Sequence, residues 1–214
     1  MTTYGILLFD SAQERDFTGP WEVFTTSSGL RGGADDVLLV AERSAPVRCS
    51  QGMRVLPDHG LDDHPPLDVV LVPGGRGARE AETRNERITG WLTDTAARAT
   101  WVLGVCTGTF LLHAAGPARS RRVATHWQYE DALEERGDVT VVRDARYVVD
   151  GSLLTSQGVS AGIDSTLWLV GHLHGREHAR AVRRALQYDS APPRPADEPV
   201  PLSPADRETE YRPT

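Results

Sequence analysis

The sequence predicts one α/β domain built on a doubly wound, mostly parallel sheet, with helices on both of its faces. Short aliphatic runs alternate along the chain with longer stretches that have the apolar spacing of helices. Two of the short runs, residues 69–72 and 101–105, show no alternation of polar and apolar side chains. Such runs are typical of strands that are covered on both faces of a parallel sheet.

The expected elements follow in order along the chain. The strands are bounded by turn-forming residues and span residues 4–9, 37–41, 69–72, 101–105 and 153–155. The helices are expected over residues 18–28, 85–98, 109–115 and 163–173. Thr18 would cap the first helix and Pro20 would lie in its first turn. Residues 139–142 and 147–149 predict a small β-hairpin inserted before the last core strand.

A change in composition after Tyr188 divides the chain into a domain, residues 1–190, and a tail, residues 191–214. The tail holds half of the 14 prolines and has few apolar side chains to bury. We therefore expect it to be extended or disordered, with packing along a partner subunit as the alternative.

All 23 basic residues are arginine, and the chain contains no lysine. This composition excludes Schiff-base and pyridoxal-phosphate enzymes, which need a lysine amine, and a P-loop, which needs its lysine. The net charge of −7 and the dispersed arginines argue against a nucleic-acid partner. No signal peptide and no membrane-length apolar stretch are recognisable, so we expect a soluble, cytoplasmic protein whose thiols stay reduced.

The most informative segment runs from Gly104 through Cys106 to Gly108. It follows a strand and precedes a helix, and it fits the G-x-nucleophile-x-G elbow, in which small neighbours permit a strained turn. A helix N-terminus directed at the sulfur would favour the thiolate, the nucleophilic form. The alternative is a small buried cysteine in a glycine-rich loop. Cys49 lacks such a context and is expected to be a structural or surface thiol.

A nucleophile also needs groups that bind an anion. The strand over residues 69–72 is followed by Pro73, Gly74 and Gly75, whose backbone N–H groups could face the elbow. The N–H groups of Gly75 and Thr107 would together form an oxyanion-type hole. The alternative is an ordinary turn between a strand and a helix.

Asp16 is the best candidate for the proton carrier. It follows the first strand, and ligands of open α/β sheets bind outside the carboxyl ends of the strands. The equally weighted alternative is that Asp16 is only a charged residue in the segment before a helix capped by Thr18. Glu22 is a weaker candidate for the proton carrier.

Six ordered blocks, spread over roughly residues 4–193, together resemble the ThiJ/PfpI superfamily, relatives of the class I glutamine amidotransferases. Within that superfamily the isonitrile hydratase branch is the most similar. The blocks are residues 16–24, 72–75, 104–108, 124–127, 155–164 and 185–189.

The resemblance implies a flavodoxin-like homodimer in which Cys106 is the nucleophile and Asp16 its acid partner. Aspartate at this position is typical of the hydratase branch, whereas deglycase and chaperone-like members usually have glutamate. Thr107 stands where protease-like members have histidine, which argues against peptidase activity. His126 lies near the elbow in relatives, and Gly158 belongs to a turn that is expected to form part of the substrate pocket.

The implied activity is that of a lyase, which hydrates an isonitrile to an N-substituted formamide without a metal or organic cofactor. Cys106 and Asp16 would carry the reaction on a small-molecule substrate. Two alternatives remain open. The first is another cysteine-dependent enzyme, acting on a specialised metabolite or of the glyoxalase or deglycase type. The second is a non-enzymatic redox sensor, because an accessible thiol of low pKa is readily oxidised.

Three histidines, His172, His174 and His178, lie close together in the sequence. On a helix, His174 and His178 would share a face at a spacing that can hold a metal. Gly171 and Gly175 interrupt the helical pattern, so we expect no metal site.

Overall fold

A computed structural model describes residues 1–189, and the tail expected over residues 191–214 lies outside the described residues. The centre of the domain is a seven-stranded sheet with the order β10-β11-β7-β6-β1-β2-β5. Neighbouring strands are parallel except for β10, which is antiparallel to β11. The strands are β1 (Thr3–Leu8), β2 (Asp36–Ala41), β5 (His59–Gly60), β6 (Val69–Val72), β7 (Trp101–Val105), β10 (Tyr147–Asp150) and β11 (Leu153–Ser156).

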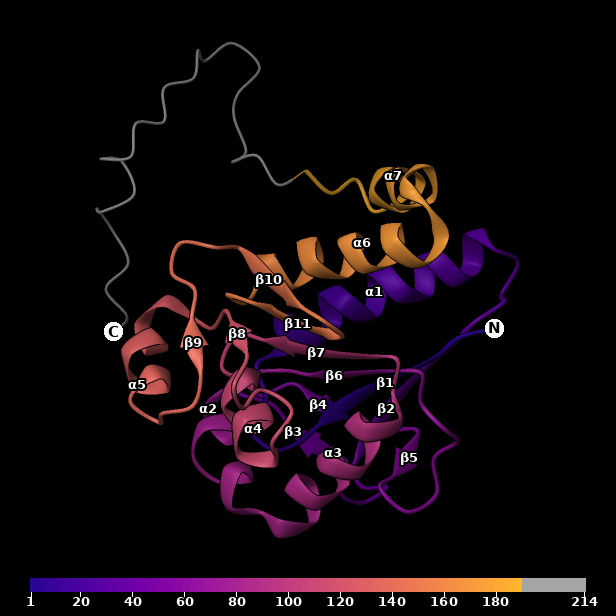
Figure 1. The fold of residues 1–214 in the computed structure, drawn as a ribbon. Coiled ribbons are helices and arrows are strands. Elements are labelled where there is room, and N and C mark those ends of the chain that lie inside the picture. Colours follow the sequence, from indigo (N-terminus) through magenta and orange to yellow (C-terminus); the bar gives the residue numbers. More distant parts are fainter. Residues whose placement is uncertain (190–214) are drawn as a thin grey trace.

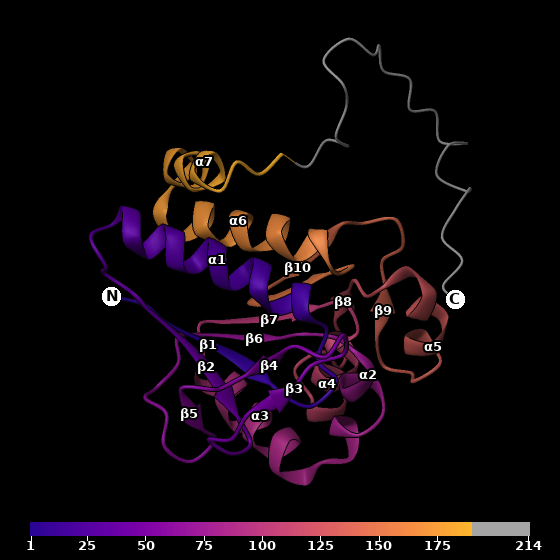
Figure 2. The ribbon, with the colours of Figure 1, turned by 180° about the vertical axis from the view of Figure 1, so that it is seen from behind.

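Helices cover both faces of this sheet, as predicted (Figures 1 and 2). On one face α1 and α6 lie side by side, and α7 packs outside α6. The other face is covered by α2, α3 and α4. Their bounds are α1 (Glu14–Leu30), α2 (Arg76–Arg79), α3 (Glu86–Arg98), α4 (Gly108–Ala115), α6 (Ser160–His174) and α7 (Arg176–Ala185).

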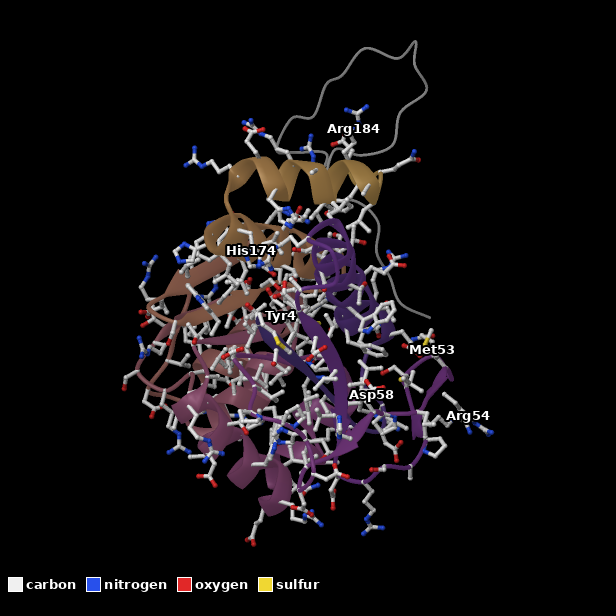
Figure 3. All side chains as sticks on the ribbon, turned by 90° about the vertical axis from the view of Figure 1, so that its right-hand side faces the viewer. Tyr4, Met53, Arg54, Asp58, His174 and Arg184 are labelled. Atoms are coloured by element: carbon white, nitrogen blue, oxygen red, sulfur yellow. The ribbon has the colours of Figure 1, made fainter. Side chains whose placement is uncertain are left out.

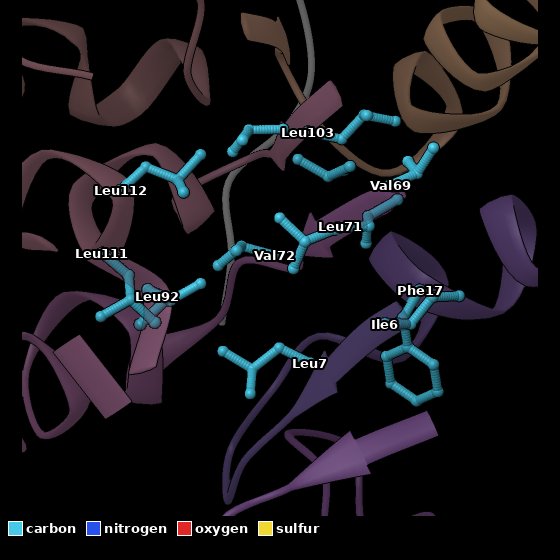
Figure 4. Close-up of a cluster of buried hydrophobic side chains, with 14 of the residues drawn as sticks. Ile6, Leu7, Phe17, Val69, Leu71, Val72, Leu92, Leu103, Leu111 and Leu112 are labelled. Carbon is cyan, nitrogen blue, oxygen red and sulfur yellow. The ribbon is translucent and has the colours of Figure 1, made fainter. Parts of the chain in front are cut away.

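The core lies between the sheet and the two helical layers (Figure 4). Every residue of β6 and β7 is buried, which agrees with their uninterrupted apolar sequences. Leu92 of α3 and Leu111 of α4 pack on one face of the sheet, and Phe17 of α1 packs on the other. Burial of such side chains drives folding by about 1.5–3 kcal/mol each. The carboxyl ends of the strands are thereby held in fixed positions.

The first helix begins earlier than the sequence predicts. It starts at Glu14 after an extended Gln13, so the expected cap, Thr18, lies inside the helix and donates its hydroxyl to the Glu14 carbonyl. Pro20 is also internal, where its ring nitrogen cannot donate to the carbonyl four residues earlier. Asp16 therefore sits in the first turn of a helix and not in a loop before it.

The structure has a β-hairpin in this region, but its strands are β10 and β11 and not the two expected segments. Residues 139–142 do not pair with residues 147–149, because β9 (Thr140–Val141) pairs in parallel with β8 (Arg122–Val123) in a separate sheet. Instead β10 forms an antiparallel hairpin with β11. Gly151, with φ of 61°, lies between them and supplies the left-handed conformation that such tight turns need.

Several short elements have no counterpart in the sequence prediction. They are β3 (Val47–Arg48), β4 (Arg54–Val55), β5, β8, α2, α5 (Glu130–Glu134) and α7, together with two turns of 3₁₀ helix (Glu82–Arg84 and Trp127–Tyr129). Two-residue strands contain too few positions to show an alternating pattern, which explains why they were not predicted. Among residues 1–189, no helix has the length and apolar character required to cross a bilayer.

The histidines near the C-terminal end of the domain fall on two helices. Gly175, with φ of 92°, separates His174 at the end of α6 from His178 in α7. His174 Nε2 lies 3.3 Å from the Tyr4 hydroxyl (Figure 3) and 3.1 Å from a nitrogen of Arg31. These contacts give His174 a structural role between α6 and β1.

Candidate active site

Cys106 lies at the turn between β7 and α4, as the sequence predicts. Its φ of 58° places it in the left-handed region, which is rare for a residue with a side chain. The turn is held by hydrogen bonds on both sides, from the Cys106 N–H to the Ser156 carbonyl at 2.9 Å and from the Thr125 hydroxyl to the Cys106 carbonyl at 2.9 Å. Gly108 permits the close approach, because a Cβ there would lie 2.2 Å from the Val72 carbonyl oxygen.

Asp16 reaches this elbow from the first turn of α1. Its side chain is fully buried and forms a hydrogen bond with the Cys106 side chain. Asp16 Oδ2 accepts from the Gly74 N–H at 3.1 Å, and Oδ1 accepts from the Val159 N–H at 2.8 Å. The structure thus brings together Cys106, Asp16 and Gly74.

Two glycines make room for this pair. A Cβ on Gly74 would lie 2.8 Å from both Asp16 Oδ2 and Cys106 Cβ. A Cβ on Gly158 would lie 2.9 Å from the Cys106 sulfur, and Gly158 has a φ of 125° that favours glycine. Gly158 therefore packs directly against the thiol, and both positions can hold only a residue without a side chain.

Burial dominates the electrostatics of the pair. Desolvation raises the pKa of Asp16 to about 6, although hydrogen bonds from Val159 and Gly74 oppose the shift. Desolvation and the nearby Asp16 charge raise the pKa of the Cys106 thiol well above its usual range. The Thr107 N–H lowers the pKa of the thiol, as expected at a helix N-terminus, but this effect is the smaller one. The helix N-terminus therefore acts on the thiol in the expected direction, but burial and the Asp16 charge together outweigh it.

Thr107 and Gly75 bind each other in this structure. The Gly75 N–H donates to Thr107 Oγ1 at 2.9 Å, and the same hydroxyl lies 3.2 Å from the Gly75 carbonyl oxygen, to which it can donate. The Thr107 N–H is directed at the Cys106 sulfur. The Gly75 N–H is thus engaged by Thr107, and the oxyanion-type hole formed by Gly75 and Thr107 stays a prediction.

His126 follows Thr125, which bonds to the elbow. Its ring is partly buried, lies 5.9 Å from the Trp127 ring in a stacked arrangement, and accepts from the Gln128 N–H through Nδ1 at 3.3 Å. Burial and the Arg79 charge lower the pKa of His126. Within residues 1–189, no hydrogen bond joins His126 to Cys106 or Asp16. His126 is thus linked to the elbow through the backbone of Thr125, whose hydroxyl donates to the Cys106 carbonyl.

The rival candidates lie in different surroundings. Glu22 is exposed on α1, so it lacks the buried environment of Asp16. Cys49 is buried in the core, where desolvation and the Glu14 charge raise the pKa of its thiol to about 11. A thiol of this kind is protonated and unreactive at neutral pH.

Sequence reasoning missed three contributors to the site. Val159 donates its N–H to Asp16, Thr125 donates its hydroxyl to the elbow, and Ser156 accepts the Cys106 N–H. Two of these contacts use backbone groups, which every residue type provides, so no sequence pattern marks them. Val159 and Ser156 do fall within the resembling block 155–164, and Thr125 within the block 124–127.

A doubly wound sheet with a left-handed cysteine at a strand-to-helix turn defines an α/β protein of the nucleophile-elbow class. The chain belongs to the DJ-1/PfpI family, whose family model matches residues 4–171. This is the ThiJ/PfpI superfamily that the sequence blocks resemble.

The chain is similar to curated members of this family with different activities. It is 39% identical to an isonitrile hydratase of Pseudomonas putida, over 88% of this chain and 79% of the relative. It is 28% identical to the glutathione-independent glyoxalase DJR-1.2 of Caenorhabditis elegans, over 77% of this chain and 88% of the relative. Among solved structures, a ThiJ/PfpI family protein from Pseudomonas syringae superposes with a TM-score of 0.82 at 28% identity, covering 92% of this chain and 79% of that one.

Proposed function

We propose that the protein is a hydratase, a lyase that converts an isonitrile into an N-substituted formamide without a cofactor. The observation that supports this proposal is the buried hydrogen bond between the side chains of Cys106 and Asp16. The pKa of Asp16, about 6, suits both the uptake and the release of a proton at neutral pH. The similarity to the Pseudomonas putida isonitrile hydratase supports the same choice of substrate.

The first step adds the thiol across the terminal carbon of the isonitrile. At neutral pH Asp16 is mostly ionised and Cys106 carries a proton, because both pKa values are raised but that of the thiol is much higher. Asp16 accepts the thiol proton while the Cys106 sulfur bonds to the carbon. Asp16 then delivers this proton to the same carbon, which gives a thioimidate and leaves the carboxylate ready for the next step.

The second step consumes water. Asp16 accepts a proton from a water molecule whose oxygen bonds to the thioimidate carbon, and it delivers this proton to the nitrogen. The carbon–sulfur bond then breaks, the formamide leaves, and the proton on the new hydroxyl returns through Asp16 to the Cys106 sulfur. The balance is one isonitrile and one water for one formamide, so no oxidant, reductant or metal is required.

The neighbouring residues have supporting roles in this proposal. Gly74 holds Asp16 through its N–H, and Gly158 keeps the space beside the sulfur open. The Thr107 N–H stabilises negative charge on the substrate, and the Thr107 hydroxyl orients the Gly75 turn through its contacts with the Gly75 N–H and carbonyl. His126 forms part of the surroundings of the substrate and does not transfer the proton.

A panel of aliphatic and aromatic isonitriles, with methylglyoxal as the control substrate, tests the proposal. The wild-type protein should produce formamides, and Cys106→Ala should reduce kcat/KM by at least about 1,000-fold, a loss typical of nucleophile removal. Cys49→Ala is the matched control and should retain activity. Equal turnover by Cys106→Ala, or turnover of methylglyoxal alone, would contradict the proposal. The second outcome would favour the glyoxalase-type alternative that the Caenorhabditis elegans relative represents.

We also propose that the protein works as a cytoplasmic homodimer on a small-molecule substrate, without nucleic-acid or membrane partners. The family assignment and the net charge of −7 support this view. Light scattering of the purified protein gives the mass of the assembly and so tests the dimer directly.

A further inference from the structure

A groove of about 950 Å³ lies between α6, α7 and the β10 edge of the sheet. Its lining contains none of the residues placed around Cys106. A second cavity of about 500 Å³ continues along the same two helices and shares Trp168 and Arg180 with the first. Pockets that hold small ligands typically measure about 300–1,000 Å³, so the groove has the size of a ligand site.

Aromatic rings form one wall of this groove. Trp168 of α6 and Tyr147 of β10 are partly buried, with ring centroids 6.3 Å apart, and Tyr188 adds a third ring. The Tyr188 hydroxyl donates to Asp164 Oδ1 at 3.0 Å, which fixes that ring in place. Rings held in this way offer large apolar surfaces to a flat ligand at little cost in side-chain entropy.

Arginines of α7 form another part of the lining. Arg180, Arg183 and Arg184 of α7 line the groove at helical spacing, in a chain whose net charge is −7. Arg180 pairs with Glu177, but both side chains are largely exposed, so the pair is weak. Among the contacts of residues 1–189, no ion pair is formed by Arg183 or Arg184.

The carboxylates of the lining do not balance this charge. Arg146 and the Tyr188 hydroxyl both bind Asp164, and Asp189 lies at the end of the described chain. The lining therefore sets four guanidinium groups, those of Arg146, Arg180, Arg183 and Arg184, against two carboxylates. The lining of the groove therefore carries a surplus of positive charge.

We propose that this groove binds a small anionic ligand with a flat ring, of the size and charge of a nucleoside diphosphate. A guanidinium group can donate two parallel hydrogen bonds to the oxygens of one phosphate group. The aromatic side chains of the lining can stack on the flat ring of the ligand. Both features occur in one cavity large enough for the whole molecule.

The groove is separate from the Cys106–Asp16 pair but shares the start of α6 with it. Arg146 lies 3.4 Å from the Ser160 hydroxyl, and the Tyr188 hydroxyl lies 3.3 Å from the Ser160 carbonyl. Ser160 is the first residue of α6 and follows Val159, whose N–H holds Asp16. The groove thus connects to the Cys106–Asp16 pair through the start of one helix.

Fluorescence anisotropy of N-methylanthraniloyl-ADP, titrated with the full-length protein, tests the proposal. We expect saturable binding that weakens at least tenfold in the double variant Arg183→Ala/Arg184→Ala. The double variant Arg48→Ala/Arg54→Ala is the matched control, because it removes the same charge from the exposed β3–β4 hairpin. Figure 3 shows Arg184 and Arg54 far apart on the surface of the domain. Binding by this control should equal that of the wild type, and circular dichroism verifies that both variants are folded.

Competition separates recognition of the ring from recognition of charge. Unlabelled ADP should displace the probe at least tenfold more effectively than inorganic pyrophosphate. Displacement by pyrophosphate as effective as that by ADP would overturn the proposal, because charge alone would then explain binding. Absence of saturable binding, or equal weakening in both double variants, would also overturn it. None of these measurements uses isonitrile turnover, so this proposal and the proposed function succeed or fail separately.

Discussion

The backbone N–H of Val159 donates to Asp16 Oδ1 at 2.8 Å, across a distance of 143 positions in the sequence. Val159 has a φ of 50°, which a β-branched residue rarely adopts. Gly158 precedes it and packs against the Cys106 sulfur. Strain of this kind persists only where surrounding contacts hold it, and it is concentrated at functional sites. The turn before α6 therefore fixes the orientation of the Asp16 carboxylate toward the thiol.

The rate of isonitrile hydration should depend on pH through Asp16. Desolvation raises the pKa of Asp16 to about 6, and only the ionised carboxylate can accept the thiol proton. We expect kcat/KM to be low below this pKa, to increase tenfold per pH unit in that range, and to level off above pH 7. A pH profile measured between pH 4.5 and 8.5 tests this expectation. A flat profile would show that Asp16 is not the base.

Asp16→Glu should reduce activity although it keeps the carboxylate. Both oxygens of Asp16 are held by backbone N–H groups, those of Gly74 and Val159, in a fully buried space. An added methylene cannot fit without moving one of these bonds, and overpacking of this kind costs about 1–3 kcal/mol. We expect a 10- to 100-fold loss of kcat/KM with little change in KM. Wild-type activity in this variant would contradict the tight fit.

Gly74→Ala tests the close packing around the pair. Its Cβ would lie 2.6 Å from the Thr107 nitrogen and 2.8 Å from Asp16 Oδ2, and these neighbours cannot move freely. We expect kcat/KM to fall at least 100-fold and the protein to lose about 1–3 kcal/mol of unfolding free energy, as overpacked sites do. Gly90→Ala in α3 is the matched control, since no atom lies within 4 Å of its Cβ. It should keep full activity and gain about 0.5–1 kcal/mol from helix propensity.

The Thr107 hydroxyl should matter through its two contacts with Gly75. Thr107→Val removes both while keeping the shape, which leaves the Gly75 N–H and carbonyl without this partner. We expect a 10- to 100-fold lower kcat/KM for Thr107→Val and at most a threefold change for Thr107→Ser. A similar loss in both variants would show that the methyl group and not the hydroxyl is important.

Asp16 should also make the fold less stable at neutral than at acidic pH. Its pKa is raised from an ordinary value of 3.8 to about 6, so between these values the folded chain binds more protons than the unfolded chain. The stability that Asp16 contributes is complete below pH 3.8 and is lost as the pH rises through 6. From pH 4 to pH 7 the loss is on the order of 2 kcal/mol.

Urea unfolding of wild type and Asp16→Asn at both pH values isolates this effect from other carboxylates. Asparagine at position 16 does not titrate, so the stability of Asp16→Asn relative to wild type should improve by about 2 kcal/mol between pH 4 and pH 7. A difference between the two proteins that does not change with pH would mean that Asp16 titrates normally in the fold.

Local patterns in the sequence determined much of this protein. Aliphatic runs predicted β1, β2, β6, β7 and β11. In β6 and β7 the runs are uninterrupted, because burial on both faces needs apolar side chains at successive positions. The spacing of Gly104, Cys106 and Gly108 predicted the elbow, because a strained turn needs small neighbours. The pair Asp150–Gly151 is a turn signal, and it marks the hairpin between β10 and β11.

Only the tertiary structure decided how the site works. The sequence named Asp16 and Cys106, but the raised pKa of each follows from desolvation by segments that are far away along the chain. It predicted a free Gly75 N–H, whereas folding brings the Thr107 hydroxyl to that group. Desolvation and backbone hydrogen bonds depend on which segments meet in space, and a local pattern of residue types contains no information about that meeting.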